Sequence, residues 1–254
     1  MSGKTGSVRK ILLTRAPEDN SALRIELEKL GFRVIEIPAL ETVALKPSND
    51  GEIAAKWNSF GWMVFSSRRA VRHLLGWMKE KSLEFPLKTR YAAVGKGTGE
   101  ELSAAGVKTD VMPPVEDGEH LGTCLLGAFP PSTAFFPSSR GGLRTAQEIL
   151  IKGNWAVSEL ELYETIPRKI RDEELSLLKE GADLAFFASP SAFSAFADSP
   201  SAFRAISRTK VLPIGATTLG RASELGLNAI SPPGDTSLTE ILKTIREYFR
   251  MSAP

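Results

Sequence analysis

The sequence predicts an α/β fold made of two similar domains with parallel sheets. Short apolar segments alternate with segments that have helical periodicity, and the whole pattern recurs once along the chain. Residues 10–15 form the first apolar strand, and residues 17–30 follow with leucines at helical spacing. Gly31 is suited to end this helix. Residues 34–38 then have the pattern of a second strand, so the segment is a βαβ unit of the kind that builds parallel sheets.

Five further strands follow the same pattern. Each is a short apolar segment that leads into small polar residues and, in most cases, a helical pattern; they are expected at 62–65, 91–94, 134–136, 184–187 and 211–214. In open parallel sheets, ligands bind beyond the carboxyl ends of the strands. The polar residues after each strand are therefore the first candidates for a functional site.

The chain contains a tandem duplication. Four pairs of segments match in the same order, with offsets of 122, 122, 120 and 119 residues: 30–31 with 152–153, 65–67 with 187–189, 95–98 with 215–218, and 112–114 with 231–233. A period of about 120 residues is far longer than a solenoid repeat. We therefore expect two similar α/β domains with a cleft between them.

Composition excludes several classes of protein. The 254 residues are 42% hydrophobic and 24% charged, which is enough to form a substantial core. The 32 basic and 30 acidic residues give a net charge of +2, so no nucleic-acid partner is expected. A local anion pocket needs no such surplus. With one cysteine (Cys124) and two histidines (His73 and His120), we expect no metal site.

Nothing in the sequence indicates a membrane. The segment from Met1 to Lys10 is polar and lacks the apolar region of a signal peptide, and no apolar run approaches the ~20 residues of a membrane span. A lone cysteine is compatible with a reducing compartment. We therefore expect a cytoplasmic protein.

The glycine-rich segment 95–99 is a candidate anion site. Gly95 and the residues through Thr98 follow a strand and open a helix, where backbone N–H groups favour a carboxylate or phosphate. Glu100 occupies the position at which a dinucleotide fingerprint has its third glycine. The simpler interpretation is a tight turn with Thr98 as the helix cap. The matching segment 215–218 favours a functional role.

Serine-rich helix starts form a second group of candidates. Ser67 and Ser189 have the pattern of N-caps, which leaves other N–H groups for a ligand. Arg68 lies where a cation opposes the helix dipole unless an anion is bound. Segment 136–144 places arginines among glycines and offers bidentate pairing to carboxylates, although a solvated loop explains it equally well.

Tyr163 lies in segment 160–167, at the end of a further predicted strand, and a half-buried sheet aromatic is the simpler interpretation of it. His73 and His120 lack the spacing of a catalytic triad or metal site, so we interpret them as ordinary surface or groove residues.

Taken together, the motifs resemble the uroporphyrinogen-III synthase (HemD) family from about residue 10 to residue 245. The resemblance is carried by an ordered set of short signatures: Leu13-Thr14-Arg15, Gly31, Pro38, Phe65-Ser66-Ser67 with Ala70-Val71, Ala93-Val94-Gly95 with Thr98, Tyr163 with Thr165, Phe187 with Ser189-Pro190-Ser191, and Ile214-Gly215 with Thr217-Thr218. It implies that the chain starts one domain, builds the second and returns through a two-stranded linker. Domain one would be residues 1–38 plus 168–254, domain two residues 44–161, and the linkers 39–43 and 162–167.

The resemblance also implies the reaction. Members of this family close hydroxymethylbilane, a linear tetrapyrrole with eight carboxylates, into uroporphyrinogen III. Water is lost and the last ring is inverted through a spiro intermediate, and no metal or cofactor is required. Tyr163 matches the family's candidate proton donor.

The remaining positions would bind the substrate carboxylates: Arg15, Ser67, Arg68, Gly95, Lys96, Thr98, Ser138, Arg140, Arg144, Ser189, Ser191, Gly215, Thr217 and Thr218. Many relatives have Arg-Gly directly after the strand where this chain has residues 137–141, so the basic group at Arg140 is displaced.

A second function stays open at this point, because fold does not fix function. It is a non-catalytic two-domain module that closes on a small anionic ligand. For either function we expect a monomer, and for the enzyme a transient contact with hydroxymethylbilane synthase, which makes its substrate.

Overall fold

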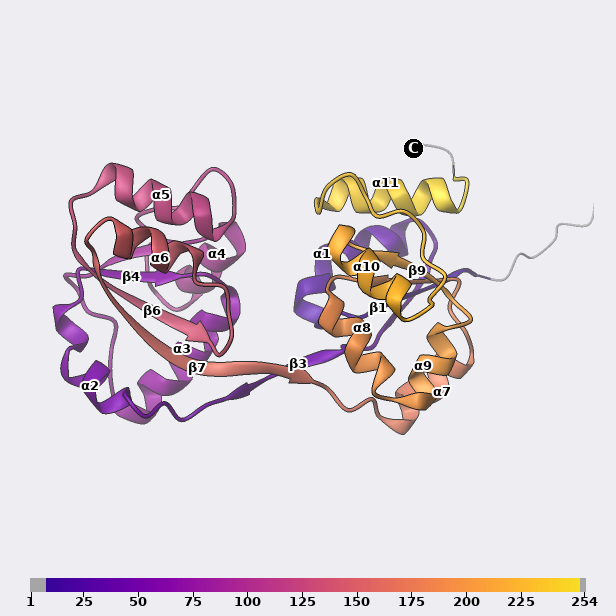
Figure 1. The fold of residues 1–254 in the computed structure, drawn as a ribbon, viewed down its shortest axis with the longest axis horizontal. Coiled ribbons are helices and arrows are strands. Elements are labelled where there is room, and N and C mark those ends of the chain that lie inside the picture. Colours follow the sequence, from indigo (N-terminus) through magenta and orange to yellow (C-terminus); the bar gives the residue numbers. More distant parts are fainter. Residues whose placement is uncertain (1–7, 252–254) are drawn as a thin grey trace, which may run out of the picture. The chain divides into compact units, whose positions relative to one another are not determined.

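The structure is a computed structural model that describes residues 8–251. Residues 1–7 of the polar N-terminal segment lie outside the described residues. The chain divides into two compact units, and each is described by itself. Unit 1 comprises Met1–Glu41 and Ile166–Pro254, and unit 2 comprises Thr42–Thr165 (Figure 1).

The sheet of unit 1 has four parallel strands in the order β2-β1-β8-β9. The strands are β1 (Lys10–Leu13), β2 (Arg33–Glu36), β8 (Leu184–Phe187) and β9 (Lys210–Pro213). Ile11, Leu12 and Leu13 are all fully buried, and alternate side chains enter different core clusters. Both faces of the sheet are therefore covered, which explains why these strands are continuous apolar runs.

Helices form the outer layers of unit 1. One apolar cluster joins a face of the sheet to α1 (Pro17–Lys29) and α11 (Leu238–Tyr248). The other cluster joins the opposite face to α7 (Asp172–Lys179), α8 (Pro190–Ala197), α9 (Pro200–Ile206) and α10 (Ala216–Glu224). Stacked Phe187 and Phe193, with ring centroids 3.9 Å apart, connect β8 to α8. Unit 1 is thus a three-layer α/β/α domain.

The sheet of unit 2 has five strands in the order β3-β7-β6-β4-β5. They are β3 (Leu40–Ala44), β4 (Trp62–Phe65), β5 (Arg90–Ala93), β6 (Thr133–Ser139) and β7 (Ala156–Pro167). The pairs β4–β5, β4–β6 and β6–β7 are parallel. The N–H of Leu45 donates to the carbonyl of Leu162, and the N–H of Arg168 donates to the carbonyl of Ala39, so β3 and β7 run in opposite directions. These two strands carry the chain between the units.

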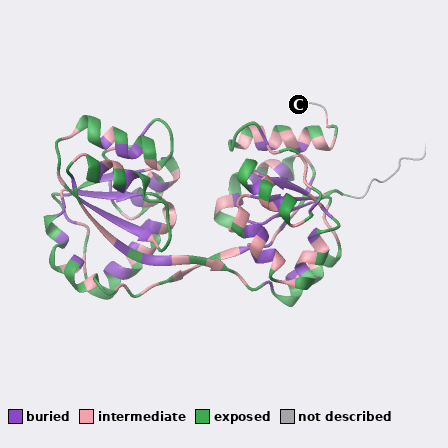
Figure 2. Ribbon diagram, in the orientation of Figure 1, coloured by how far each residue is buried: buried purple, intermediate pink, exposed green. Residues whose placement is uncertain are grey.

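Helices cover both faces of this sheet as well. On one side lie α2 (Asp50–Ala55), the 3-10 turn η1 (Trp57–Ser59), α3 (Arg68–Lys81) and α4 (Lys96–Ala104), and on the other lie α5 (Gly118–Ala128) and α6 (Thr145–Lys152). Figure 2 shows the pattern, with buried strands inside helices whose outer faces are exposed. Ser67 and Asp117 cap α3 and α5 by accepting backbone N–H groups of the first turn.

The two units repeat one topology. The order β2-β1-β8-β9 of unit 1 corresponds to β7-β6-β4-β5 of unit 2, with β1-α1-β2 equivalent to β6-α6-β7. The segment β1-α1-β2 belongs to the first sequence repeat but packs with β8 and β9 of the second. The segment β6-α6-β7 belongs to the second repeat but packs with β4 and β5 of the first. The predicted fold class, two similar parallel-sheet domains joined by a two-stranded connection, is confirmed.

Candidate active site

Tyr163 lies on β7 of unit 2 and is only 5% exposed. Its register with β6 contains a bulge: Ser138 pairs with Glu161, but the next residue, Ser139, pairs with Tyr163. Leu162 is the extra residue, and both it and Tyr163 join the apolar cluster beneath α3. A bulge turns the following side chain away from the direction that strict alternation would give it. The position of Tyr163 therefore depends on an irregularity in the sheet.

Helix α3 holds the phenol at its hydroxyl. The hydroxyl of Tyr163 is 3.1 Å from Ser67 Oγ, which also accepts the N–H of Ala70 at 3.1 Å. Ser67 therefore caps the helix, as the simpler interpretation predicted, and also contacts Tyr163. Either hydroxyl of this pair can donate to the other. When Ser67 donates to the phenol oxygen, the phenol hydrogen is available to a ligand.

His73 holds the same phenol at its ring face, which corrects its interpretation as an ordinary surface or groove residue. The rings of His73 and Tyr163 are stacked, with centroids 4.5 Å apart and planes 10° from parallel. The Nε2 of His73 lies 3.1 Å from Thr42 Oγ1. Burial, and then the charge of Arg69, lower the pKa of His73 below its usual value. The imidazole that faces Tyr163 is therefore neutral at pH 7.

A pocket of about 580 Å³ opens beside Tyr163. It brings together the ends of β4 and β6, the middle of β7 and the first turns of α5 and α6, and its lining includes Ser66, Ser67, Glu116, Ser138, Gly142, Arg144, Gln147, Glu159, Glu161 and Tyr163. Four of the predicted site residues meet here: Ser67, Ser138, Arg144 and Tyr163. The carboxylates in the lining were not predicted, because nothing in the local sequence shows which glutamates reach this edge of the sheet.

Two of the predicted arginine anchors of unit 2, Arg140 and Arg144, are ion-paired with glutamates of β7. Arg144 Nε donates to Glu159 Oε1 at 2.8 Å, and Arg140 lies 3.5 Å from Glu161 and 3.6 Å from Glu164. Both arginine side chains are more than half exposed. An ion pair between two exposed side chains, such as Arg140 and Glu161, contributes only about 0–1 kcal/mol. The side chain of Glu159 is 19% exposed, so its separation from Arg144 costs more than that of the exposed pair.

The predicted anion loop at residues 95–98 already holds a carboxylate of the chain itself. Oε1 of Glu116 accepts the N–H of Lys96 at 2.8 Å. A Cβ at position 95 would overlap the carboxyl end of Glu116, so any other residue there would displace this side chain. The cap of α4 is Gly95 and not Thr98, and the N–H of Thr98 is bonded to the carbonyl of Gly95 at 3.1 Å. Thr98 therefore does not offer the donor that was predicted.

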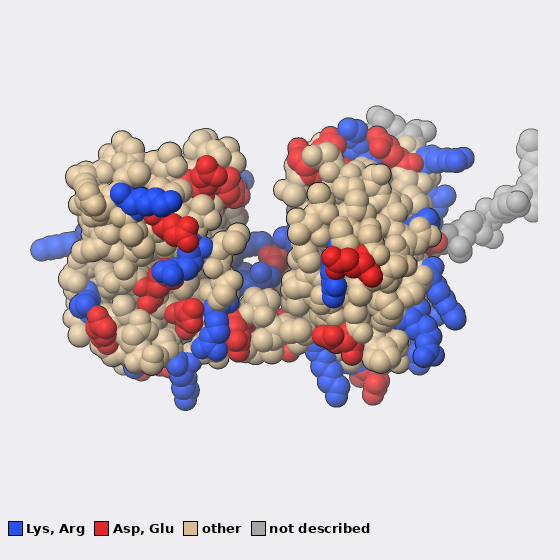
Figure 3. Space-filling view, viewed as in Figure 1, with Lys and Arg blue, Asp and Glu red and all other residues tan. Residues whose placement is uncertain are grey.

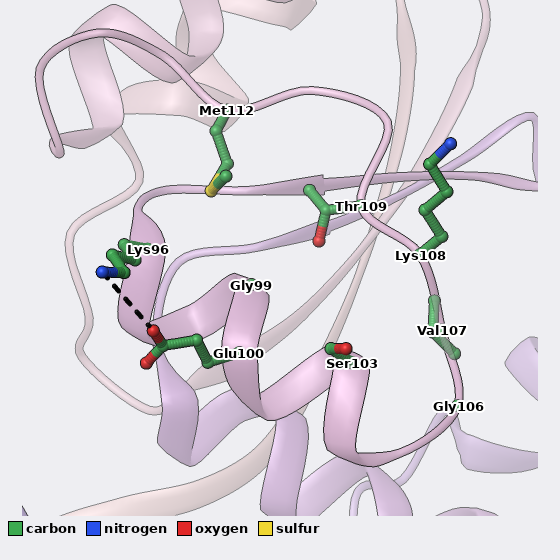
Figure 4. A pocket seen from close by; sticks show the side chains of 9 residues that line it. All are labelled: Lys96, Gly99, Glu100, Ser103, Gly106, Val107, Lys108, Thr109 and Met112. Carbon is green, nitrogen blue, oxygen red and sulfur yellow. Dashed lines mark ion pairs between the residues drawn. The ribbon is translucent and has the colours of Figure 1, made fainter.

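Lys96 lies apart from Tyr163, at a second pocket of unit 2. This pocket, of about 490 Å³, lies between α4 and the segment that follows it. Lys96 is directed toward Glu100, whose carboxylate is 3.9 Å away, while Lys108 lies at the other end of the lining (Figure 4). Arg68 packs across Gly97, with Nε 3.5 Å from where a Cβ would be. Neither Arg68 nor Lys96 lines the pocket beside Tyr163.

The predicted residues of unit 1 lie at the carboxyl ends of its strands. Ser189 caps α8 by accepting the N–H of Ala192 at 3.2 Å, and its Oγ is 3.1 Å from Ser191 Oγ. Gly215 caps α10, and nothing lies within 4 Å of a Cβ built there. The first turn of α10 carries Thr217, which is exposed, and Thr218, which is 3% exposed. Arg15 follows β1 at the same edge.

The remaining observations concern surface charge, metal-binding groups and membrane-spanning helices. Basic and acidic side chains are interspersed on the face shown in Figure 3. Within residues 8–251, no group of three or more His, Cys, Asp or Glu residues is arranged to hold a metal ion. In the same range, none of the helices combines the length and apolar character needed to span a membrane.

Comparisons with known proteins agree with the motifs. The sequence model of the family described as "Uroporphyrinogen-III synthase HemD" matches residues 21–238. A uroporphyrinogen-III synthase of Chlorobaculum parvum is 27% identical over 87% of this chain and 91% of its own length. One from Synechococcus elongatus is 26% identical over 92% of this chain and 87% of its own length.

Solved structures show the same fold. Uroporphyrinogen-III synthetase of Helicobacter pylori covers 95% of this chain and 100% of its own at a TM-score of 0.60 and 14% identity. A mutant synthase of Thermus thermophilus covers 96% and 99% at a TM-score of 0.55 and 19% identity. These identities support the fold alone, whereas the family match spans most of the sequence. The chain therefore belongs to the uroporphyrinogen-III synthase family, lyases of tetrapyrrole biosynthesis.

Proposed function

We propose that this chain closes hydroxymethylbilane to uroporphyrinogen III, with inversion of the last ring and release of water, and that Tyr163 is the proton donor. The observation that carries the role of Tyr163 is its buried phenol, held at the hydroxyl by Ser67 and facing a 580 Å³ pocket. A non-catalytic binding module is not favoured, because the family is one of enzymes.

The proton balance of the reaction suits a phenol. Tyr163 would donate its proton to the leaving hydroxyl as the C–O bond breaks, and water departs. The substrate is left as an azafulvene cation, and the already substituted carbon of the last pyrrole attacks it to form the spiro intermediate. The older bond from that carbon to its methylene bridge then breaks, which leaves a second azafulvene cation. The free carbon of the inverted pyrrole attacks this cation and loses its proton, and this proton restores the phenol. A positioned acid of this kind contributes about 10²–10⁴-fold to the rate.

Binding would use positions already occupied by the chain's own carboxylates. In unit 2, Glu116 lies on the N-terminus of α4 and Glu159 on Arg144, both of which a substrate carboxylate would fit. Arg68 and Arg140 would supply further positive charge. In unit 1, the starts of α8 and α10 have the chemistry for the same task. There the donors would be Ser189, Ser191, Gly215, Thr217 and Thr218, with Arg15 beside them.

The assay supplies hydroxymethylbilane generated in situ by the preceding enzyme and separates the porphyrin isomers after oxidation. We expect mainly the type III isomer. Only the type I isomer, which forms spontaneously, from folded protein would exclude the enzymatic function.

Tyr163→Phe tests the proton donor, and Tyr248→Phe is its control because it removes a phenol from α11 of unit 1. We expect kcat to fall by about 10²-fold or more in Tyr163→Phe and to stay unchanged in the control. Normal turnover by Tyr163→Phe would reject Tyr163 as the donor and leave the overall function standing.

The last part of the proposal concerns the location, the oligomeric state and the partner of the protein. We propose a cytoplasmic monomer that takes its unstable substrate from hydroxymethylbilane synthase by transient contact. Sedimentation of this chain, alone and with that enzyme, tests both the monomer and the contact.

A further inference from the structure

We propose that His73 is a positioning residue for the reaction, which aims the hydroxyl of Tyr163 into its pocket by holding the phenol ring. The proposal rests on Tyr163 being the proton donor. The first observation is that α3 contacts Tyr163 twice, through Ser67 at the hydroxyl and through His73 at the ring face. A ring fixed at these two points has little freedom to rotate or tilt.

The second observation is that His73 also contacts the other crossing strand. Its Nε2 is 3.1 Å from Oγ1 of Thr42, the first residue of unit 2 on β3, whereas Tyr163 lies on β7. The imidazole therefore joins α3 to both strands that carry the chain between the units. A plain packing residue at this position would fill space but would not make the bond to Thr42.

The internal duplication supplies a comparison within the molecule. The offset that aligns Ser67 with Ser189 places Ala195 at the position of His73. Glu164-Thr165 matches Glu41-Thr42 at the same offset as the registers Thr133↔Ala156 and Lys10↔Arg33, which places Leu40 at the position of Tyr163. Ala195 and Leu40 belong to one apolar cluster of unit 1. The fold therefore needs only apolar packing here, and the histidine–tyrosine pair is a specific addition in unit 2.

The protonation state of His73 is compatible with this task. Burial and the neighbouring charge of Arg69 lower the pKa of His73, so the ring stays uncharged at neutral pH. A neutral imidazole can stack flat on the phenol and share one hydrogen with Thr42 without placing a cation beside the leaving group. The stacked geometry is the expected state of the free enzyme.

The test uses the whole protein and a set of matched variants. His73→Ala removes the ring and the bond to Thr42, His73→Phe keeps a flat ring, and Thr42→Val removes only the hydroxyl. His120→Ala is the control, because it removes the other histidine, which is exposed and bonded to Asp117. For His73→Ala we expect kcat to fall by about 10- to 100-fold, as a misplacement near 1 Å does.

Three further results separate positioning from other roles. KM should stay near that of the wild type, since the variants leave the substrate anchors in place. His73→Phe should recover only part of the kcat that His73→Ala loses, because it restores the ring contact but not the bond to Thr42, and Thr42→Val should show a similar partial loss. In a Tyr163→Phe background, His73→Ala should cause no further loss, because its effect passes through the phenol. An equal loss in both backgrounds, or no loss in either, would overturn the proposal.

A spectroscopic measurement covers the case in which Tyr163→Phe has too little activity to compare. The chain has three tyrosines, so ¹³C-tyrosine labelling gives three ring signals, and Tyr163→Phe identifies the one to follow. We expect His73→Ala to shift that signal and leave those of Tyr91 and Tyr248 unchanged, with His73→Phe preserving a ring-current shift. An unmoved Tyr163 signal would reject the positioning role, whatever the activity of Tyr163→Phe.

Discussion

The carboxylate of Glu174 fixes the point at which the returning chain enters unit 1, and its removal should cost much of that unit's stability. Glu174 is 5% exposed and accepts three hydrogen bonds: from the backbone N–H of Arg171 at 2.8 Å, from the guanidinium of Arg171 at 2.9 Å and from that of Arg168 at 2.9 Å. Arg168 in turn donates to the carbonyl of Pro38 at 2.7 Å. One buried carboxylate therefore joins α7 to both crossing segments.

The cost of Glu174→Gln follows from these contacts. The amide oxygen of glutamine can still accept the N–H of Arg171. The NH₂ group then faces the guanidinium of Arg171, and two donors cannot form a hydrogen bond with each other. The substitution also removes the negative charge that neutralises Arg168. Breaking a buried pair costs about 3–5 kcal/mol, whereas the pair with the exposed Arg171 adds only about 0–1 kcal/mol. The side chain of Arg168 is 15% exposed, so water offsets part of the loss. We expect a destabilisation of about 3 kcal/mol, at the lower end of that range.

Urea unfolding followed by far-UV circular dichroism measures this change. Glu173→Gln is the control, because it removes the same charge from an exposed position of the same turn and should change stability by less than about 0.5 kcal/mol. Burial raises the pKa of Glu174, but the hydrogen bonds from Arg171 and Arg168 outweigh it, and the net pKa is lowered. The stabilisation is therefore present above the unfolded pKa and is lost as the pH falls through the folded value. A loss under about 1 kcal/mol, or one that persists unchanged in acid, would refute the assignment of this energy to the ion pair.

Two further predictions concern unit 2. Gly122→Ala should destabilise, because its Cβ would lie 3.1 Å from the Cα of Ala146 and force α5 from α6 at a cost of about 1–3 kcal/mol. Gly127→Ala in the same helix meets nothing within 4 Å and should instead stabilise by about 0.5 kcal/mol, so that thermal midpoints moving in the same direction would contradict the packing argument. Burial, helped by the charge of Asp110, raises the pKa of Tyr91 to about 12. The unfolded chain loses this proton first, near pH ~10, so stability should fall as the pH rises from there toward 12, and Tyr91→Phe should remove that dependence. Parallel stability–pH curves for the two proteins would show that Tyr91 is not responsible.

Much of the architecture could be predicted from the sequence because it is written in local patterns. Strands buried on both faces must be continuous apolar runs, and residues 62–65, 184–187 and 211–214 are of this kind. The strand expected at 134–136 extends to Ser139, because the polar residues after Phe136 still pair with β7. Local propensity underestimates the length of a strand when its last residues are held in the sheet only by pairing with a neighbouring strand.

The sequence by itself determined the fold class, the duplication and the family, and it made Tyr163 a candidate, since these depend on residue type and order. Tertiary structure alone decided which groups meet Tyr163. His73, 90 positions away in the chain, reaches its ring, and a single extra residue, Leu162, turns the phenol toward α3. Glu116 fills the helix start that was predicted for a ligand. Such contacts depend on register and on long-range packing, in which one residue of slip redirects every side chain, and no local pattern encodes that slip.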